Sequence, residues 1–364
     1  AAAKNYKFTS IISSRDQYKD FTEHYKLNNG EALLEYRSIL ATDAFKQTVN
    51  YDTEIVKYFS GEKAYELRYG ENPHQKASFV GDLDSLFTKL GGKELSYNNL
   101  LDVDAAVALV TDISIPEQCT FAILKHNNAC GCAIMPTAKE AFESALAADP
   151  VSAFGGILIC DKEVDLETAK EIDKLFYEVC IATSFSAEAK ELLTARSKRV
   201  LLQWNRQDFK QDIVRSCLNG VLIQERDLSF SSRDQLSAVT MIKPTEDQIR
   251  DMLFAEKLVK HTKSNAIILV KDQQLIASGT GQTSRVDALN QAILKAKTFK
   301  LNIKGAAMAS DAFFPFPDCV EIASEAGVAA IVQPGGSIKD QLSIDMANSK
   351  RIVMVTTGVR HFRH

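Results

Sequence analysis

Short apolar runs alternate with amphipathic stretches along most of the chain. The runs typical of buried strands cover residues 121–124, 156–159, 266–270, 329–332 and 352–355. Helical spacing of apolar residues is clearest at 137–148 and 285–297. From residue 63 onward this alternation predicts an α/β layered fold with a mainly parallel sheet.

The first 62 residues follow a different pattern. A β-like stretch at 9–12 precedes three stretches with helical spacing, at 15–26, 30–48 and 51–59. Because three helices and one strand bury little apolar surface together, we expect this segment to be an incomplete domain.

A polar stretch at 203–233, around the only tryptophan, divides the rest of the chain. The two parts are similar in plan, since each carries a Lys-His pair that we expect at the edge of a strand, Lys125-His126 and Lys260-His261. We therefore predict three domains, at 1–62, 63–203 and 204–364.

Composition narrows the class of protein. The chain carries 43 Lys and Arg against 47 Asp and Glu, and a net charge of −4 argues against a nucleic-acid binder, whose surface is basic. No apolar run approaches the ~18 residues of a membrane span, and the first residues do not resemble a signal peptide. Seven irregularly spaced cysteines do not suggest a disulfide framework. We expect a cytoplasmic protein with reduced thiols and with neither a membrane nor a nucleic-acid partner.

Lys125-His126 follows directly on a predicted strand. Open α/β sheets usually build their sites at the carboxyl ends of strands, so the position favours chemistry. The Lys125 ammonium favours the neutral form of the His126 imidazole, which acts as a general base near pH 7. A purely structural histidine is the alternative, and both interpretations stay open.

Residues 68–75, with the sequence RYGENPHQ, set one aromatic among polar and turn-forming residues. Arg68 has the planar guanidinium that suits a phosphate. A surface turn closed by Asn72-Pro73 is the competing interpretation.

Two glycine-containing turns precede predicted helices and offer backbone amides to an anion, at 279–285 and 333–337. Arg285 at the start of a helix adds positive charge where the helix dipole is also positive, which favours an anion between them. The sequence does not rank the two turns as phosphate sites.

Residues 310–318, with the sequence SDAFFPFPD, set three aromatic rings between carboxylates and beside two prolines. Since proline excludes a regular helix or a central strand, we expect an irregular loop. Its rings either stack on a flat heterocycle or fill the core.

Taken in order, these segments resemble the AICAR formyltransferase/IMP cyclohydrolase family of purine biosynthesis. The resemblance runs through 67–75, Lys125-His126, 149–155, Ser264-Asn265, 281–285, 310–316 and 360–364. It implies transfer of the formyl group of 10-formyltetrahydrofolate to the 5-amino group of AICAR, giving FAICAR, without a catalytic metal. The zinc signature of the similar cytidine deaminases, His-x-Glu with Pro-Cys-x-x-Cys, is absent from the sequence.

The resemblance also implies roles for individual residues. His126 matches the family's proton-shuttling histidine, Lys125 its neighbour, and Asn265 an asparagine that holds the reacting groups. The residues that match the substrate-binding set are Arg68, Tyr69, Arg285, Phe313, Asp318, Arg360 and His364. The tail departs from the family pattern at positions 361 and 363, to which we assign no role.

Fold and assembly follow from the same resemblance. It implies two cytidine-deaminase-like three-layer α/β/α halves, at 63–203 and 204–364, after a remnant of a methylglyoxal-synthase-like cyclohydrolase domain at 1–62. We expect a homodimer with AICAR and folate bound at its interface.

Ring closure is not expected of this chain, because Ala2-Ala3-Lys4-Asn5 matches a stretch inside the cyclohydrolase domain. Two alternatives stay open. The chain is a fragment of a bifunctional enzyme that also has IMP cyclohydrolase activity, or it is an inactive nucleotide-binding homologue.

Overall fold

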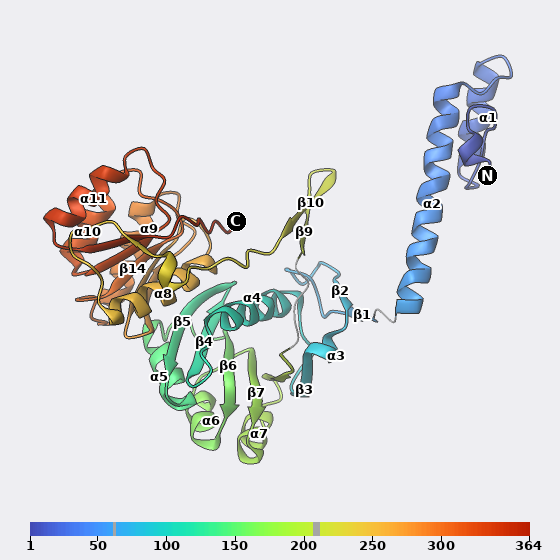
Figure 1. Ribbon diagram of the computed structural model, residues 1–364. Helices are drawn as coiled ribbons and strands as arrows, with labels where there is room; N and C mark the ends of the chain where they lie inside the picture. Colours follow the sequence, from blue (N-terminus) through green and yellow to red (C-terminus); the bar gives the residue numbers. More distant parts are fainter. Residues whose placement is uncertain (61–62, 207–211) are drawn as a thin grey trace. The chain divides into compact units, whose positions relative to one another are not determined.

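The computed structural model describes residues 1–60, 63–206 and 212–364 (Figure 1). They form two compact units, one of residues 1–65 with 79–82 and the other of residues 66–78 with 83–364. In the described part of the chain, no helix is both long enough and apolar enough to cross a membrane.

The first unit is mainly helical. Its elements are η1 (Ala3–Asn5), α1 (Gln17–Leu27), α2 (Leu34–Ser60) and a ribbon of β1 (Lys63–Glu66) with β2 (Ser78–Gly81). The predicted strand at 9–12 is wrong, because residues 1–60 contain no strand with which it could pair. The predicted break near residue 50 is also wrong, because no glycine or proline interrupts the helix there and α2 continues.

The second unit contains a 12-stranded sheet in the order β11-β16-β15-β14-β12-β13-β5-β4-β6-β7-β8-β3. The strands are β3 (Phe87–Gly91), β4 (Cys119–Lys125), β5 (Asn128–Met135), β6 (Ile157–Val164), β7 (Val179–Phe185), β8 (Val200–Trp204), β11 (Ser237–Ala238), β12 (Ile267–Lys271), β13 (Gln274–Gly279), β14 (Ala307–Ser310), β15 (Ala330–Gln333) and β16 (Val353–Thr356). The five predicted strands are confirmed, with shifted boundaries.

Most neighbouring strands in this sheet are antiparallel, so the predicted mainly parallel sheet is wrong. Parallel pairing is confined to β6-β7-β8 and β14-β15-β16. Two-residue turns connect β4 to β5 and β12 to β13, and strands joined by such short turns must run antiparallel.

The sheet is built from two runs of elements with the same order. The first is β3-α4-β4-β5-α5-β6-α6-β7-α7-β8, and the second is β11-α8-β12-β13-α9-β14-α10-β15-α11-β16. The helices are α3 (Leu83–Leu86), α4 (Tyr97–Ile113), α5 (Ala138–Ala148), α6 (Leu166–Asp173), α7 (Ala187–Thr194), α8 (Glu246–Lys260), α9 (Arg285–Thr298), α10 (Asp318–Ala326) and α11 (Asp340–Ser349). The runs meet where β13 pairs with β5, and we call them the first and second halves.

The segment between the halves contains a hairpin of β9 (Asp212–Cys217) with β10 (Gly220–Glu225), followed by η2 (Arg233–Gln235). Both hairpin strands are exposed along their whole length.

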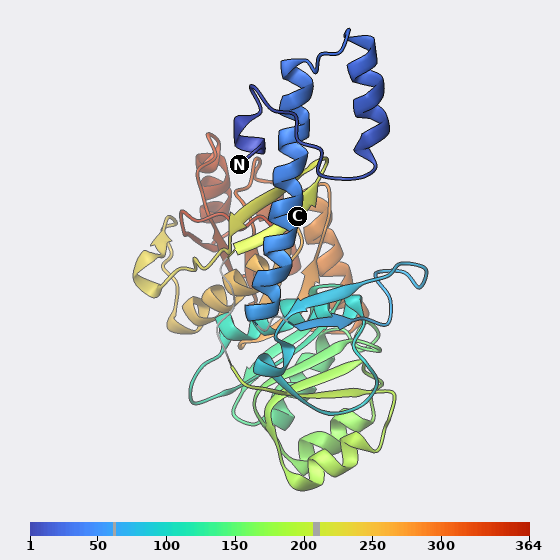
Figure 2. The same cartoon turned by 90° about the vertical axis from the view of Figure 1, so that its right-hand side faces the viewer.

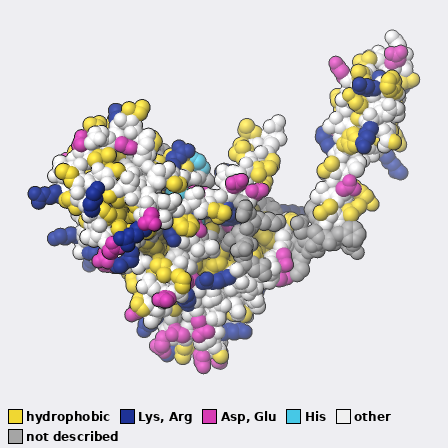
Figure 3. All heavy atoms as spheres, viewed as in Figure 1, with side chains coloured by type: hydrophobic (Ala, Val, Ile, Leu, Met, Phe, Trp, Pro, Cys, Tyr) yellow, Lys and Arg dark blue, Asp and Glu magenta, His cyan; other side chains and the backbone are white. Residues whose placement is uncertain are grey.

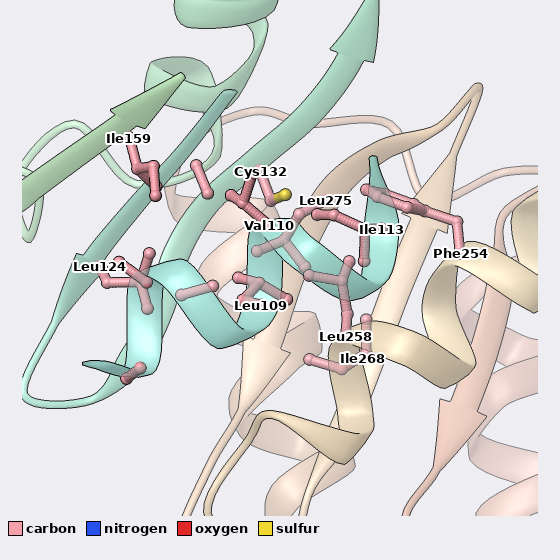
Figure 4. Packing of buried hydrophobic residues seen from close by; sticks show 14 of the residues in the cluster. Leu109, Val110, Ile113, Leu124, Cys132, Ile159, Phe254, Leu258, Ile268 and Leu275 are labelled. Atoms are coloured by element: carbon pink, nitrogen blue, oxygen red, sulfur yellow. The ribbon is translucent and has the colours of Figure 1, made fainter. Parts of the chain in front are cut away.

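Helices cover both faces of the sheet. Along β4, Ala122 and Leu124 pack with α4 and α8, whereas Phe121 and Ile123 pack with α5, α6 and α7. The side chains of α4 and α8 meet over one face (Figure 4), and α6 and α7 lie together on the other (Figure 2). Helices α9, α10 and α11 cover the corresponding face of the second half. The second unit is therefore a three-layer α/β/α structure.

Candidate active site

His126 and Asn127 form the two-residue turn between β4 and β5. Both have positive φ, 52° and 63°, as in type I′ hairpin turns. Lys125 ends β4, and its Nζ donates to the Phe154 carbonyl oxygen at 2.8 Å. The His126 side chain is exposed. Lys125 and His126 therefore lie at a strand end, as predicted.

Lys260 and His261 lie elsewhere than predicted. Lys260 is the last residue of α8 and His261 is its C-cap. Both side chains are buried against Asp112 of α4, with Lys260 Nζ at 2.9 Å and His261 Nε2 at 2.7 Å from Asp112 Oδ2. This second Lys-His pair thus joins two helices of the core.

Asn128 links the His126 turn to the loop that carries Asn265. Its Nδ2 donates to the His126 carbonyl oxygen at 2.8 Å, and its Oδ1 accepts from the Lys263 N–H at 2.9 Å. Because Lys263 belongs to the second half, this one side chain connects the halves at the site.

Asn265 is held by the turn before α9. Its backbone N–H and its Nδ2 both donate to the Gln282 carbonyl oxygen, at 3.1 and 3.0 Å. The Gln282 N–H donates to the Asn265 carbonyl oxygen at 3.3 Å, and the Gly281 N–H to that of Lys263 at 2.8 Å. The Ser264-Asn265 peptide bond is cis.

Some backbone amides of the two glycine turns bind protein groups. In the turn at 279–285, Gly281 and Gln282 donate to the loop of Asn265. In the turn at 333–337, the Gly336 N–H donates to the Asp340 carboxylate at 2.7 Å. These three amides already have acceptors within the protein.

Arg285 also contacts an anionic side chain of the protein. Arg285 Nη2 donates to Asp311 Oδ1 at 3.2 Å, and Asp311 is fully buried. Arg285 Nε and Asp311 Oδ2 are buried without a hydrogen-bond partner among the described residues. The pair therefore has unused hydrogen-bonding capacity.

The C-terminal tail is docked on the loop of Asn265. The Ser264 N–H donates to the Arg363 carbonyl oxygen at 2.9 Å, and the Arg363 N–H returns a hydrogen bond to Ser264 Oγ at 3.0 Å. Arg363 Nη1 donates to the His261 carbonyl oxygen at 2.6 Å.

Phe362 brings together three of the predicted substrate-binding residues. The guanidinium carbons of Arg360 and Arg285 lie 4.4 and 5.8 Å from the centroid of its ring, and the His364 ring lies 5.7 Å away. The sequence analysis missed Phe362, because an aromatic residue in a polar terminal segment has no periodicity to reveal its role.

His361, also missed, anchors the tail. Its ring is 3% exposed, with Nδ1 2.6 Å from Asp227 Oδ2 and Nε2 3.7 Å from Glu256 Oε1. Burial alone lowers the pKa of His361, but the Glu256 and Asp227 carboxylates outweigh it, so the pKa is raised. Glu256 lies on the buried side of α8. A buried carboxylate needs a charged partner, and this need could have pointed to His361.

The raised pKa of His361 predicts a pH-dependent anchor. The stabilisation is complete below the unfolded-state pKa of ~6.5 and is lost as pH rises through the folded-state pKa. His361→Asn should therefore lower the free energy of unfolding by about 1 to 2 kcal/mol near pH 6 and by less near pH 9. Urea titrations followed by Trp204 fluorescence test this, and a cost independent of pH would contradict it.

Arg68 and Tyr69 are not joined to this cluster. Arg68 Nη2 donates to the Tyr69 hydroxyl at 2.8 Å, and its guanidinium carbon lies 4.6 Å from the centroid of the Tyr69 ring. In the described structure, no hydrogen bond, ion pair or ring contact links either residue to Lys125, His126 or Asn265.

The aromatic loop combines the two predicted arrangements. Phe314 is fully buried in the core, whereas Phe313 and Phe316 are 37% and 51% exposed. Asp318 begins α10 and accepts a hydrogen bond from the Cys319 N–H at 2.8 Å. Phe313 and Asp318 therefore lie on the loop that follows Asp311, without a direct contact to His126 in the described structure.

One group of possible metal ligands occurs among the described residues, namely Cys119, Cys160 and Asp161, with ligand atoms within 4.8 Å of one another. These residues are buried on β4 and β6, and Asp161 Oδ1 already accepts from the Thr120 N–H at 2.7 Å. No contact in the described structure joins them to the cluster around His126.

Comparison with known proteins shows to which family the chain belongs. A family model described as the AICARFT/IMPCHase bienzyme matches residues 2–295. The chain belongs to the AICARFT/IMPCHase family. The bifunctional purine biosynthesis protein PurH of Bacteroides thetaiotaomicron is 50% identical over 374 residues, which cover 100% of this chain and 73% of that relative. PurH of Aquifex aeolicus is 43% identical, with 100% and 74% covered.

A solved deaminase/reductase of Thermotoga maritima aligns with 30% of the chain and with 35% of its own length, at a TM-score of 0.22 and 19% identity. This likeness is too low to test the predicted deaminase-like halves. The AICARFT/IMPCHase assignment therefore rests on the family model and the PurH relatives, as the sequence motifs predicted.

Proposed function

We propose that this chain transfers the formyl group of 10-formyltetrahydrofolate to the 5-amino group of AICAR, giving FAICAR and tetrahydrofolate. The observation that carries the proposal is the cluster in which Asn128 joins the His126 turn to the loop of Asn265. This cluster lies in a chain whose family is described as an AICARFT/IMPCHase bienzyme.

The chemistry needs a base, because the 5-amino group is conjugated with an imidazole carboxamide and is a weak nucleophile. His126, exposed on its turn, takes the amine proton as the new C–N bond forms to the formyl carbon. The same proton then passes to N10 of the folate as the bond between N10 and the formyl carbon breaks.

Lys125 and Asn265 support this step. An ammonium has three N–H donors, and Phe154 uses one of those of Lys125, so others remain for the developing oxyanion. Asn265 Nδ2 is held by Gln282, which fixes the amide so that its oxygen can orient the reacting groups.

We assign the phosphate of AICAR to the arginines around Phe362. Arg285 and Arg360 both lie against this ring, and Asp311 neutralises only one of them. The remaining positive charge suits a phosphate. Phe313 and Asp318 follow on the neighbouring loop, and His364 lies on the same ring as the arginines.

A homodimer completes this proposal, with Arg68 and Tyr69 contributed across the interface. The β9–β10 hairpin supports it, because Val214, Val221 and Ile223 form an apolar stripe on one face and each is about 60% exposed (Figure 3). An isolated two-stranded hairpin is marginally stable, so a second copy that covers the stripe would stabilise it. The double variant Val221→Lys, Ile223→Lys should form a weaker dimer, with a lower average mass in light scattering at low protein concentration. A mass equal to that of the wild-type dimer at the same concentration would contradict this role of the hairpin.

We also propose that the two halves are deaminase-like, that residues 1–62 belong to the cyclohydrolase domain, and that the protein is cytoplasmic. The repeated order of elements supports the first point. The seven free cysteines, six of them buried, support the last, because a reducing compartment keeps thiols free.

The test is the initial rate of tetrahydrofolate release, followed by absorbance, when the purified chain is mixed with AICAR and 10-formyltetrahydrofolate. Omitting AICAR controls for hydrolysis of the folate. Formation of FAICAR that requires both substrates supports the proposal, and a folded dimer that binds AICAR without turnover would contradict it. Chromatography of the same mixture also reports any IMP.

A further inference from the structure

An aspartate on α4 binds the backbone of the His126 turn. Asp102 Oδ1 accepts a hydrogen bond from the Asn127 N–H at 2.6 Å, and the His126 N–H also interacts with this carboxyl. Asp102 is half-buried beneath the turn, while the His126 ring is exposed above it. One carboxylate thus holds the backbone of both turn residues.

The second half repeats this arrangement. Asp251 of α8 accepts from the Asp272 N–H at 2.9 Å and from the Gln273 N–H at 2.8 Å, in the turn between β12 and β13. Asp272 and Gln273 have φ of 53° and 56°, close to the values of His126 and Asn127. The fold therefore uses an aspartate on the inner helix to bind each hairpin turn.

This repeat explains how the turns tolerate their residues. Two-residue turns with positive φ favour Asn-Gly, because a side chain larger than glycine is strained in this backbone region. Hydrogen bonds from the turn amides to a charged acceptor are stronger than neutral ones and offset that strain. The aspartates thus allow a residue such as histidine at the first turn position.

The two turns differ in what they carry. The turn in the second half bears Asp272 and Gln273, and the Gln273 carbonyl oxygen accepts a hydrogen bond from the Ile134 N–H at 3.1 Å. The turn in the first half bears His126, which is joined through Asn128 to the loop of Asn265. The Asp102 turn therefore carries an imidazole next to the loop of Asn265, whereas the Asp251 turn pairs with β5.

We propose that Asp102 is a positioning residue that fixes the His126 turn for formyl transfer and favours the imidazolium formed when His126 takes the amine proton. This inference rests on the proposed function. The charged side chains beside the turn are Lys125 at the end of β4, Lys263 after α8 and the acidic residues of α4. Of these acidic residues, Asp104 pairs with Arg226 at 3.0 Å and Asp112 with Lys260 at 2.9 Å, whereas Asp102 binds the turn.

The electrostatics of the pair agree with this role. Burial raises the pKa of Asp102, while the turn amides and the charge of His126 act in the opposite direction. Ionised Asp102 therefore attracts the positive charge that His126 acquires when it takes the amine proton. Replacing the carboxylate by an amide keeps the shape of the side chain and removes this attraction.

The experiment compares Asp102→Asn with the matched control Asp251→Asn. Asp102→Asn should lower kcat about 10- to 100-fold with little change in the KM for AICAR, as expected for a displaced catalytic group. Asp251→Asn should destabilise the protein to a similar degree but leave kcat within about 2-fold, because it binds a turn without a catalytic residue.

A direct readout is the NMR titration of the histidine Cε1–H groups, with the His126 resonance assigned by its loss in His126→Asn. The His126 midpoint should move to lower pH in Asp102→Asn and stay unchanged in Asp251→Asn. Asp102→Glu retains the charge, so its His126 midpoint should lie close to that of the wild-type protein.

Equal losses of kcat in both asparagine variants, or an unchanged His126 midpoint in Asp102→Asn, would overturn the proposal. If the wild-type chain transfers no formyl group, the proposed function fails. The midpoint comparison still decides whether Asp102 acts on His126, so the two failures are distinguishable.

Discussion

Replacing His126 by alanine should lower kcat for formyl transfer by about 100- to 10,000-fold, the usual contribution of a general base, while AICAR binding stays nearly unchanged. The physical reason is the position of the imidazole. It is exposed at the end of β4, on a turn that Asp102 and Asn128 tie to the core and to the loop of Asn265. Initial rates and calorimetric titration with AICAR measure the two quantities.

Two further variants separate loss of the base from damage to the turn. His126→Asn removes the base but tolerates positive φ, so it should be as inactive as His126→Ala and more stable. Asp272→Ala changes the equivalent position of the second turn and should keep wild-type kcat. Turnover near the wild-type rate in both His126 variants would show that His126 is not the base.

Replacing Asp112 by alanine should lower the free energy of unfolding by about 3 to 5 kcal/mol, the cost of leaving a buried charge unpaired. Lys260, only 4% exposed, lies 2.9 Å from Asp112 and would lose the anion that it contacts. Its other near neighbour is the Phe230 ring, at 5.8 Å from Nζ. Urea unfolding followed by Trp204 fluorescence measures the cost, because Trp204 is buried in β8 of the same unit.

The stability that Asp112, Lys260 and His261 contribute depends on pH. Burial alone raises the pKa of Asp112, but His261 and Lys260 outweigh it, so the pKa is lowered and the stabilisation is lost as pH falls through the folded value. Burial lowers the pKa of His261, although Asp112 acts in the opposite direction. Below about pH 6.5 the unfolded chain therefore protonates His261 more readily than the folded protein does. Both effects predict lower stability in acid.

A double variant tests whether the loss comes from the unpaired lysine. Asp112→Leu with Lys260→Met replaces the pair by apolar side chains and should recover most of the stability lost in Asp112→Ala. A double variant as unstable as the single one would indicate that packing, and not the unpaired charge, causes the loss.

The sequence predicted the elements better than their arrangement. Strands such as β4 and β12 were readable because apolar runs of that length are typical of buried strands. Their antiparallel pairing was not readable, since the connecting turns contain no glycine, and Asp102 and Asp251 bind their backbone N–H groups. A carboxylate more than twenty residues away in sequence leaves no local pattern at the turn.

The candidate site was also predictable only in part, because some of its residues are held by tertiary contacts. Lys125 and His126 were predicted from their place after a strand, and Asn265 from a family motif. Contacts of the His126 turn, the loop of Asn265 and the tail connect them with Arg285, Arg360 and His364. The residues that hold them, such as Asn128, Asp311 and Phe362, act through tertiary contacts that no spacing rule predicts. The amides of Gly281 and Gln282 likewise bind the loop of Asn265, a tertiary contact that the local sequence of the turn does not show.

The two halves repeat the same arrangement of helix and hairpin turn, but they carry different residues at the candidate site. Each half supplies an inner helix with an aspartate and a hairpin with a strained turn. One turn then carries His126, while the loop after α8 in the other half carries Asn265. The cluster therefore draws on both halves, and the Asn128 side chain connects the His126 turn to the loop of Asn265.

The central claim is that this chain moves a formyl group onto AICAR at the His126 site. The most direct measurement uses 10-formyltetrahydrofolate labelled with carbon-13 in the formyl group and follows the label by NMR in wild-type protein and in His126→Asn. The account predicts that the labelled carbon appears in FAICAR with the wild-type chain and remains on the folate with the variant. Label that stays on the folate with wild-type protein, or that moves equally well with the variant, would contradict it.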